Sequence, residues 1–388
     1  MATKQIPGDF GFGPDEEMLR DLARKFLDEH GHVNQLRKWV GDHLAVYERG
    51  ERPGWSEALW RQMVELGWTG LAVPEEADGA GFKIVGLVAL VEEVGRHALP
   101  SPLVATLNAT HALCATGGDA SLRWLARIAA GEAATLAITD SRGRWESFGG
   151  DLVASVDGDG LSLSGRACFV QDAFKARLLV TAARLGERVV LCAVPVDAPG
   201  VELSQDHIHD LTRDQATVGF TNVRVPAADV LSRDAGPALR AAWPAILVTV
   251  SADLCGAAEW QLQATVEYAK TRKQFDHPIG FFQAVKHPLV DAMVMIDRAR
   301  SLLYHAAAAI DAGDDSAQTA ARMAKSAASD AGRYVSDRSV QLHGGIGFTW
   351  ESDIHIYFKR SMHDQALYGD GVHQRRQIAE TLIGPIGG

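Results

Sequence analysis

The chain has 388 residues, of which 47% are hydrophobic and 22% are charged, so it can form large cores in two or three domains. Its formal net charge is −11 and it has no basic run. Because phosphate contacts need clustered Lys and Arg, nucleic-acid binding is not expected. The four cysteines are far apart, and His207 and His209 lack a third ligand. We therefore expect a soluble cytoplasmic protein with no metal site.

Residues 1–132 have the pattern of a helical domain. Apolar residues recur at helical spacing over 17–27 and again over 56–66. Ser56 is expected to cap the second helix, and Gly67 is expected to end it. A further helix is predicted over 84–95, ended by Gly95.

Residues 133–233 have the pattern of strands. Two alternating segments around Asp157-Gly-Asp-Gly160 predict a hairpin. Further strands are predicted over 177–183, 189–196 and 217–225. This segment is therefore expected to form a compact antiparallel, barrel-like β domain.

Residues 234–388 return to a helical pattern. Long helices are predicted over 237–271, 284–312, 316–342 and 351–382, which together suggest an antiparallel four-helix bundle. The apolar stretch 241–258 contains Pro244 and Asp253, so it is expected to be a buried helix and not a membrane span. The fold class is thus α+β, multidomain, without the βαβ alternation of a Rossmann sheet.

Two passages in the last region could carry chemistry. The first, YAKTRKQFDHPIGFFQAVKH (268–287), joins a helix end to the next helix through a basic turn. Its Arg272 can bind a phosphate, Phe275 can pack on a flat ring, and Gln283 offers a donor and an acceptor. Taken singly, an Arg at a helix end usually caps carbonyls. The second passage, QLHGGIGF (341–348), has paired glycines that let a ligand approach the backbone closely.

With these passages in this order, the chain resembles the acyl-CoA dehydrogenase family. LWRQMVELGWTGLAVPEE, VEEVGRHALPSP and VGFTNVRVP match it as well, so the likeness spans nearly the whole chain. The resemblance implies a helical domain, a central β domain and a C-terminal four-helix bundle. It also implies FAD, an acyl-CoA substrate, and a homo-oligomer that is a dimer or a tetramer built as a dimer of dimers.

The resemblance implies a set of FAD contacts from the bundle. Arg272 would reach the pyrophosphate of a neighbouring subunit's FAD, and Phe275 would pack near its adenine. Gln283 would contact the ribityl or phosphate region. The bundle residues implied in cofactor binding are Arg272, Gln274, Phe275, Gln283, Gln341, Gly344 and Gly345.

The resemblance also implies flavin contacts from the β domain. Ile138 and Thr139 would meet the pyrimidine edge, and Phe169 would pack on the isoalloxazine. Gln171 stands where the family usually has a hydroxyl, which puts the hydrogen bond near flavin N5 in doubt. The family's Gly-rich loop is replaced by the basic segment 140–145, whose arginines either contact phosphate or remain solvated.

The family's catalytic carboxylate is missing from its usual place. The family word Tyr-Glu-Gly reads Tyr368-Gly369-Asp370 here, and the alternative position on the first bundle helix is Ile246. Asp370 is the candidate replacement, although a turn Asp bonding its own backbone is at least as good an interpretation. Asp253 is a second candidate, with a structural ion pair favoured. The N–H of Gly369 could still polarise a thioester carbonyl.

These features leave three flavoprotein functions open, and a pure binding or structural protein is the remaining option. The first is FAD-dependent α,β-dehydrogenation of an acyl-CoA, with proton loss from Cα, hydride transfer from Cβ to flavin N5, and a displaced base. The second is a base-lacking companion subunit paired with a paralogue, as in family members that act on bulky, sterol-like acyl groups. The third is a flavin monooxygenase on the same fold. An electron-transfer flavoprotein is the expected acceptor for a dehydrogenase.

Overall fold

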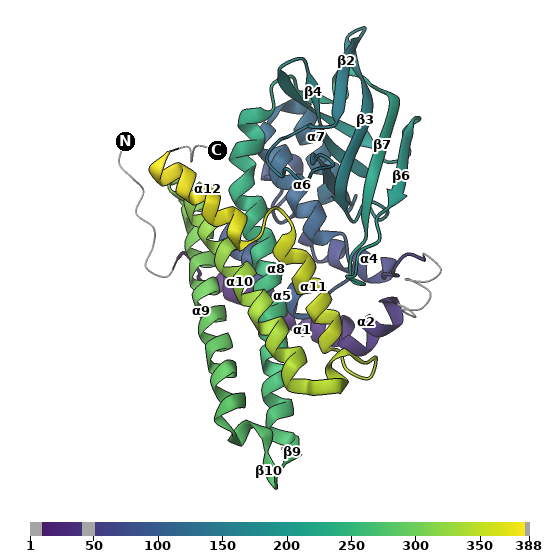
Figure 1. Ribbon diagram of the computed structural model, residues 1–388. Coiled ribbons are helices and arrows are strands. Elements are labelled where there is room, and N and C mark those ends of the chain that lie inside the picture. Colours follow the sequence, from purple (N-terminus) through teal and green to yellow (C-terminus); the bar gives the residue numbers. More distant parts are fainter. Residues whose placement is uncertain (1–9, 41–50, 385–388) are drawn as a thin grey trace.

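The computed structural model describes residues 10–40 and 51–384 (Figure 1). Helices form the N-terminal part, a sheet follows, and long helices complete the chain. The N-terminal helices are α1 (Pro14–His30), α2 (Val33–Val40), α4 (Glu57–Glu65), α5 (Ile84–Arg96), α6 (Leu103–Thr116) and α7 (Gly118–Ala129), with short turns η1 (Trp68–Gly70) and η2 (Glu75–Ala77).

The ends of these helices follow from local chemistry in most places. The Ser56 Oγ accepts a hydrogen bond from the Leu59 N–H at 3.1 Å, which confirms Ser56 as the cap of α4. Gly67, just past the end of α4, has the left-handed φ of 78° expected of a helix stop. Helix α5 ends at Arg96, one residue past Gly95, which was predicted to end it. A Cβ on Gly95 would lie 2.0 Å from the Asp253 carbonyl oxygen, so glycine is needed there for close helix packing.

The middle of the chain forms one eight-stranded sheet in the described residues. Seven of its strands lie in the order β6-β7-β3-β2-β4-β5-β8, and β1 pairs with β4. The strands are β1 (Ala134–Ala137), β2 (Leu152–Asp157), β3 (Gly160–Gln171), β4 (Leu178–Leu185), β5 (Arg188–Pro195), β6 (Val201–Gln205), β7 (Gln215–Val225) and β8 (Val230–Ser232), with the turn η3 (Ala227–Asp229) before β8.

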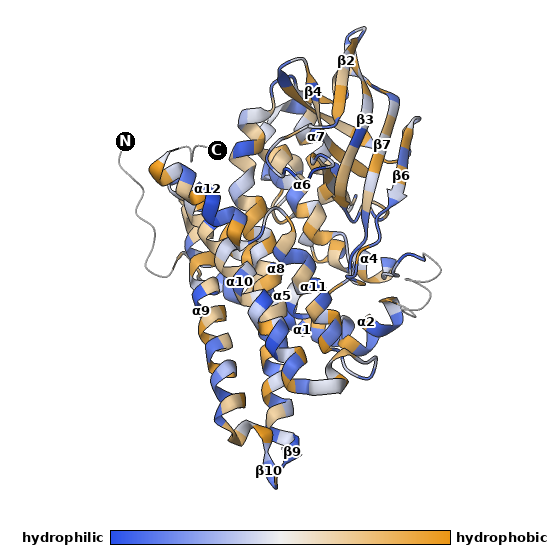
Figure 2. Cartoon of the chain, in the orientation of Figure 1, coloured by the Kyte–Doolittle hydropathy of each residue, from blue (hydrophilic) through white to orange (hydrophobic). Residues whose placement is uncertain are grey.

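The pairing within this sheet confirms the predicted hairpins and corrects one point. Asp157 pairs with Gly160 at the β2–β3 turn, as the Gly/Asp pattern predicted. The β1–β4 and β2–β4 pairs are parallel, so the sheet is mixed and not purely antiparallel. The strands carry apolar residues interspersed with polar ones, and α9 likewise shows both kinds (Figure 2).

The last third of the chain is a bundle of long helices. They are α8 (Gly236–Thr271), α9 (Gln283–Ala312), α10 (Ala317–His343), α11 (Ile354–Ala366) and α12 (Gly371–Ile383), with β9 (Lys273–Gln274), β10 (His277–Pro278), η4 (Ile279–Phe281) and η5 (Gly344–Phe348) between them. The single helix predicted over 351–382 is thus two helices. Tyr368 and Gly369, with φ of 58° and 94°, turn the chain between them.

Helix α8 is the central element of the fold. It is long and apolar enough to cross a bilayer, but 94% of its most apolar window is buried inside the protein. It packs against α5, α6, α9, α10 and α11. The prediction of a buried helix is therefore confirmed. Because one hydrophobic core joins α5, α6, α8, α10 and the sheet, the sheet and the α11–α12 turn keep a fixed position relative to each other.

Candidate active site

An apolar cavity of about 610 Å³ lies between the sheet and α11. Aromatic and aliphatic side chains form most of its wall, and the β6–β7 loop closes one side. The lining residues are Trp145, Phe169, His207, Ile208, His209, Asp210, Gln215, Phe358, Lys359, Met362, His363, Ala366 and Leu367. Its size and chemistry suit a flat aromatic ligand with a few polar edges.

Phe169 reaches the cavity from an irregular point of β3. The β3–β7 register shifts between Ala167 and Val170, and Phe169 itself has a φ of 58°. Such a bulge redirects a side chain out of the normal alternation. Thr139 lies beside it, since Thr139 pairs with Cys168 in an isolated bridge. Ile138 and Thr139 are both buried, so the structure brings these three predicted flavin contacts together.

Gln171 has no hydrogen to spare for a ligand. Its Nε2 donates to the Phe169 carbonyl oxygen at 3.1 Å and to Gln215 Oε1 at 2.8 Å. An amide nitrogen has two hydrogens, so both are used. Gln171 therefore cannot replace the family's hydroxyl as a donor near flavin N5 in this conformation.

His363, which the sequence did not single out, supplies a polar group to the cavity wall. Its Nε2 lies 2.7 Å from Gln171 Oε1, which is the acceptor end of an amide whose nitrogen is already paired. The Nε2 of His363 therefore donates this bond. Burial lowers the pKa of His363 to about 4, so the ring is neutral at physiological pH. Its Nδ1 is then an unprotonated acceptor.

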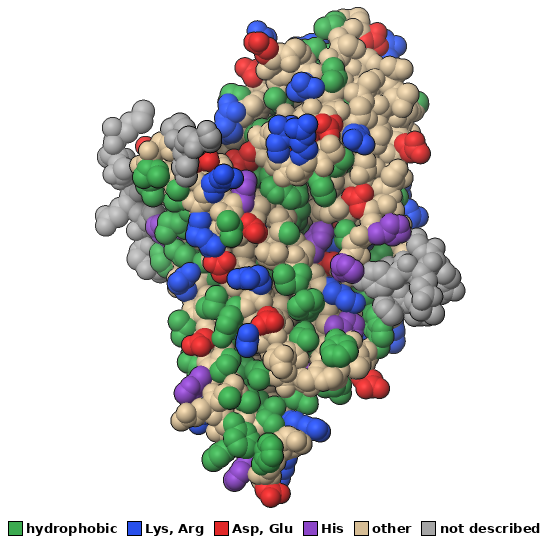
Figure 3. All heavy atoms as spheres, in the orientation of Figure 1, with side chains coloured by type: hydrophobic (Ala, Val, Ile, Leu, Met, Phe, Trp, Pro, Cys, Tyr) green, Lys and Arg blue, Asp and Glu red, His purple; other side chains and the backbone are tan. Residues whose placement is uncertain are grey.

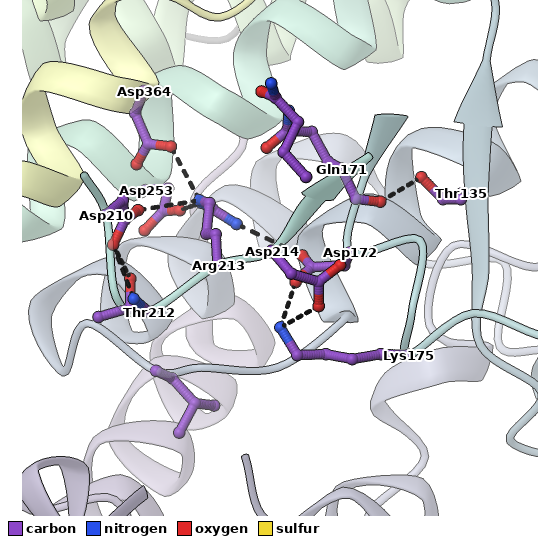
Figure 4. Close-up of polar contacts among 12 residues, drawn as sticks. Thr135, Gln171, Asp172, Lys175, Asp210, Thr212, Arg213, Asp214, Asp253 and Asp364 are labelled. Carbon is purple, nitrogen blue, oxygen red and sulfur yellow. Dashed lines mark hydrogen bonds and ion pairs between the residues drawn. The ribbon is translucent and has the colours of Figure 1, made fainter. Parts of the chain in front are cut away.

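A buried ionic network joins the sheet to α8 and α11 beside this cavity (Figure 4). Arg213 contacts Asp253 and donates to Asp364 Oδ1 at 3.0 Å. Arg360 binds both oxygens of Asp253 at 2.9 Å. Burial raises the pKa of Asp253 to about 6, against the opposing effect of Arg360. Asp253 is thus in the structural ion pair that the sequence favoured for it.

The same network continues into the β domain. Lys175 donates to Asp172 at 2.5 Å and lies 3.0 Å from Asp214. Arg213 lies 3.8 Å from Asp172, so it links the two halves. Because these groups come from three parts of the chain, the network fixes the sheet relative to the helices that carry the cavity.

The FAD contacts predicted in the bundle lie at its far end, where hydrophobic side chains gather around β9 and β10 (Figure 3). Tyr268 at the end of α8 stacks on His343 at the end of α10, with ring centroids 4.3 Å apart. The two passages therefore lie side by side within one chain, whereas the predicted meeting of such passages across a subunit contact stays a prediction. The tip residues are all exposed: Arg272, Gln274, Phe275, Gln283, Gln341, Gly344 and Gly345.

This tip is open in a single chain. Phe275 is 84% exposed, and a Cβ added to Gly344 or Gly345 would have no atom within 4 Å. Packing within the chain therefore does not explain the paired glycines, although the φ of 65° at Gly344 favours one. The open tip and the cavity by the sheet are separate places in the chain. The role of the tip residues in cofactor binding stays a prediction.

The position that the sequence aligns with the family's carboxylate has no room for a side chain unless the His373 ring moves. Gly369 has a φ of 94°, and a Cβ there would lie 2.3 Å from Cδ2 of His373. The Gly369 N–H already donates to the Ala366 carbonyl oxygen at 3.1 Å. In this conformation, Gly369 offers neither a base nor a free donor for a thioester carbonyl.

Asp370 forms the cap of α12. Its Oδ1 accepts a hydrogen bond from the His373 N–H at 2.8 Å. This is the backbone bond that the sequence gave as the alternative to catalysis. A catalytic role for Asp370 stays a prediction, and it would compete with this cap.

A buried lysine holds the turn that carries Gly369. Lys325 on α10 donates to the carbonyl oxygens of Asp364, Gln365 and Gly369 at 3.0–3.1 Å. Burial lowers the pKa of Lys325 to about 7. The three carbonyls are orphan acceptors at a helix end, so the lysine acts as a cap supplied by another helix.

The basic loop after β1 is also tied to the protein. Arg144 pairs with Asp140 at 2.6 Å, and Glu146 binds Arg322 on α10 at 2.7 and 2.9 Å. Trp145, between these two anchored residues, is half-buried and lines the cavity. Its sequence neighbours gave no sign of this, since the tryptophan follows an exposed, charged segment.

Comparisons with known proteins agree with this geometry. Residues 13–132 match the model of the acyl-CoA dehydrogenase N-terminal domain, and residues 248–383 match that of the acyl-CoA dehydrogenase C-terminal domain. Acyl-CoA dehydrogenase IpdE2 of Mycobacterium tuberculosis is 35% identical over 90% of this chain and 91% of its own length.

Solved structures are similar over the whole chain. A variant of the Tcur3481-Tcur3483 steroid ACAD has a TM-score of 0.84 and 29% identity, covering 95% of this chain and 98% of that one. The ChsE4-ChsE5 complex from Mycobacterium tuberculosis has a TM-score of 0.86 and 25% identity, covering 97% of this chain and 100% of that one.

Proposed function

The chain belongs to the acyl-CoA dehydrogenase family of FAD-dependent oxidoreductases that act on CH–CH donors, and we propose that it is the base-lacking subunit of an enzyme built from two different chains. The observation that carries this proposal is Gly369 itself, which has no carboxylate and where an added Cβ would lie 2.3 Å from the His373 ring. A positioned base contributes roughly a hundred- to ten-thousand-fold in rate, so a chain without one needs a partner that has it.

The residues by the sheet fit the ring of FAD. The cavity is apolar and bounded by Phe169 and Trp145, and its polar edge is a neutral His363. Bound FAD supplies the hydride acceptor for the dehydrogenation. Phe169 would hold the ring by packing, and Ile138 and Thr139 lie beside it. The exposed tip with Arg272 and Phe275 would hold the adenosine end of FAD bound to a neighbouring subunit.

Two relatives support a two-chain assembly and a bulky acyl group. One structure is named as a ChsE4-ChsE5 complex, and another is named as a Tcur3481-Tcur3483 steroid ACAD. We propose by analogy that the partner of this chain is a paralogue with a carboxylate at the position of Gly369. The substrate would be an acyl-CoA with a ring-bearing acyl group, and an electron-transfer flavoprotein would take the electrons.

A homo-oligomer with a displaced base is the competing function, with Asp370 as the base. It requires the Asp370 carboxylate to leave the His373 N–H that it now accepts from. In that case the purified chain alone would oxidise acyl-CoA. The two functions thus differ in one measurable property, the activity of the chain without a partner.

The test is anaerobic flavin bleaching by acyl-CoA thioesters of several chain lengths and with ring-bearing acyl groups. We expect no bleaching with this chain alone, and bleaching when it is co-expressed with a Glu-bearing paralogue. A matched complex in which the partner's Glu is replaced by Gln should not bleach. Full turnover by this chain as a homo-oligomer would rule out the companion role. Oxygen-dependent hydroxylation of the acyl group would point to a monooxygenase.

A further inference from the structure

Trp145 stands between the sheet and the turn after α11. Its ring centroid lies 5.6 Å from that of Phe169 in β3 and 5.7 Å from that of Tyr368. One side of the indole faces the apolar cavity, and the other packs on the main hydrophobic core. Trp145 therefore forms a wall shared by the cavity and the core.

The core beyond Trp145 is filled with further aromatic rings. Tyr368 lies 5.4 Å from Trp243 of α8, and Trp243 lies 5.7 Å from Phe148. Trp243 is 1% exposed and Ile246, one turn along α8, is 0% exposed. Tyr368, which does not line the cavity, packs on Trp145 and on the core, and Gly369 follows it in the chain.

This arrangement has a consequence for the reaction. In a dehydrogenation, the acyl carbons must contact both the flavin ring and the base on the other side of them. With the ring in the apolar cavity, the acyl group would have to occupy the space that Trp145 fills between Phe169 and Tyr368. Close-packed aromatic rings leave no room for it.

We propose that Trp145 is a specificity-determining residue that keeps acyl groups out of this chain's own pocket. This inference rests on the companion role proposed above, and it identifies the residue that directs the substrate to the partner's site. Gly369 removes the base, and Trp145 removes the space that the acyl group would use.

The loop around Trp145 is held by ion pairs. The next residue, Glu146, forms two hydrogen bonds to Arg322, and Arg322 is in turn bonded to Gln374 at 3.0 Å. On the other side, Arg144 is paired with Asp140. A bidentate Arg–carboxylate pair fixes orientation as well as distance. Glu146 is thus a positioning residue that holds the indole in place.

The experiment measures ligand binding to the full-length chain, independently of turnover. The probe is cinnamoyl-CoA, a ring-bearing 2-enoyl thioester that has no saturated CH–CH bond left to oxidise, and free CoA is the reference ligand. Binding is followed by calorimetry. We expect the wild-type chain to bind cinnamoyl-CoA no more tightly than CoA, because only the CoA part finds a site.

Removing the indole should open the space. Trp145→Ala is expected to bind cinnamoyl-CoA about tenfold or more tightly than the wild type, a change that calorimetry resolves, with CoA binding unchanged. Trp145→Phe should behave as the wild type, because a ring still fills the position. Glu146→Gln, which loosens the loop, should show a smaller gain in the same direction.

Two results would overturn the proposal. One is a wild-type chain that already prefers cinnamoyl-CoA to CoA by about tenfold. The other is a Trp145→Ala protein with wild-type circular dichroism and flavin content but no gain in affinity. The companion role is tested separately. Turnover by the chain alone contradicts that role, whereas an unchanged affinity of Trp145→Ala for cinnamoyl-CoA contradicts the proposed role of Trp145.

Discussion

The imidazole of His373 occupies the place that a side chain on Gly369 would need, with only 2.3 Å between a built Cβ and the ring carbon Cδ2. Contacts this short do not occur between real atoms, so one of the two groups must move. A carboxylate at position 369 would therefore need the His373 ring to move as well.

Restoring the carboxylate should accordingly need two changes. Gly369→Glu is expected to destabilise the chain by roughly 1–3 kcal/mol, because the new side chain overpacks the site and the backbone at this residue has a positive φ. Gly369→Glu combined with His373→Ala should recover most of that loss. Denaturant unfolding of both variants and of His373→Ala alone tests this. Equal stability of Gly369→Glu and the wild type would show that the His373 ring moves aside at no cost.

Substitutions at Asp370 separate its capping role from a catalytic one. Asp370→Ala should cost about 1 kcal/mol of stability through loss of the cap, and Asp370→Ser should cost little, because serine also caps helices. Neither should change the turnover of the complex with a base-bearing partner. Loss of a catalytic base lowers the rate by roughly a hundred-fold or more. A loss of that size in Asp370→Ser would identify Asp370 as the base.

The lowered pKa of Lys325 predicts a pH dependence of stability. The pKa of Lys325 in the folded chain is about 7, whereas that of a free lysine is roughly 10.4. Between these values the unfolded chain holds more protons than the folded one, so the free energy of unfolding rises with pH over that window.

Lys325→Met should abolish that rise. It should also lower the overall stability by about 1–3 kcal/mol, because the carbonyls of the α11 end lose their donor. The measurement is thermal unfolding between pH 6 and 10, which covers the two pKa values of about 7 and 10. Lys286→Met, at an exposed position, is the control and should leave the slope unchanged. A wild-type slope in Lys325→Met would contradict the assignment.

The buried ion network should be intolerant of truncation. Arg360→Met leaves Asp253 with one fewer partner in a fully buried site, at an expected cost of about 3–5 kcal/mol. Arg166→Met, at an exposed pair with a 4.0 Å separation, should cost less than about 1 kcal/mol. Urea unfolding compares the two. A cost of less than roughly 1 kcal/mol for Arg360→Met would show that the network contributes little net stability.

The open tip predicts an effect on the cofactor without an effect on the fold. Arg272→Gln should lower the flavin content of the purified oligomer, while its stability changes by less than about 0.5 kcal/mol, because the residue is exposed. Lys270→Gln, a nearby exposed cation paired with Glu267, should keep full flavin content. Unchanged flavin content in Arg272→Gln would remove this residue from the cofactor site.

Most of the architecture could be predicted from local patterns. The Ser56 cap, the hairpin at Asp157–Gly160 and the long bundle helices follow from side-chain periodicity and turn chemistry, which act over a few residues. The differences are local. Helix α5 ends one residue past Gly95, and the glycine is explained by its close packing on α8. The final helical segment breaks at Tyr368 and Gly369, whose positive φ values turn the chain and whose turn Lys325 holds through the Gly369 carbonyl oxygen.

Residue identity and spacing alone gave the family resemblance, the order of helical and β regions, and the glycine in place of a carboxylate at 369. The folded arrangement added three facts: the His373 ring crowds position 369, Arg213 and Arg360 pair with Asp253, and Trp145 packs between Phe169 and Tyr368. The physical reason is that residue identity and spacing set local conformation. Steric exclusion and buried charge pairing depend on side chains that are brought together from positions far apart in the chain.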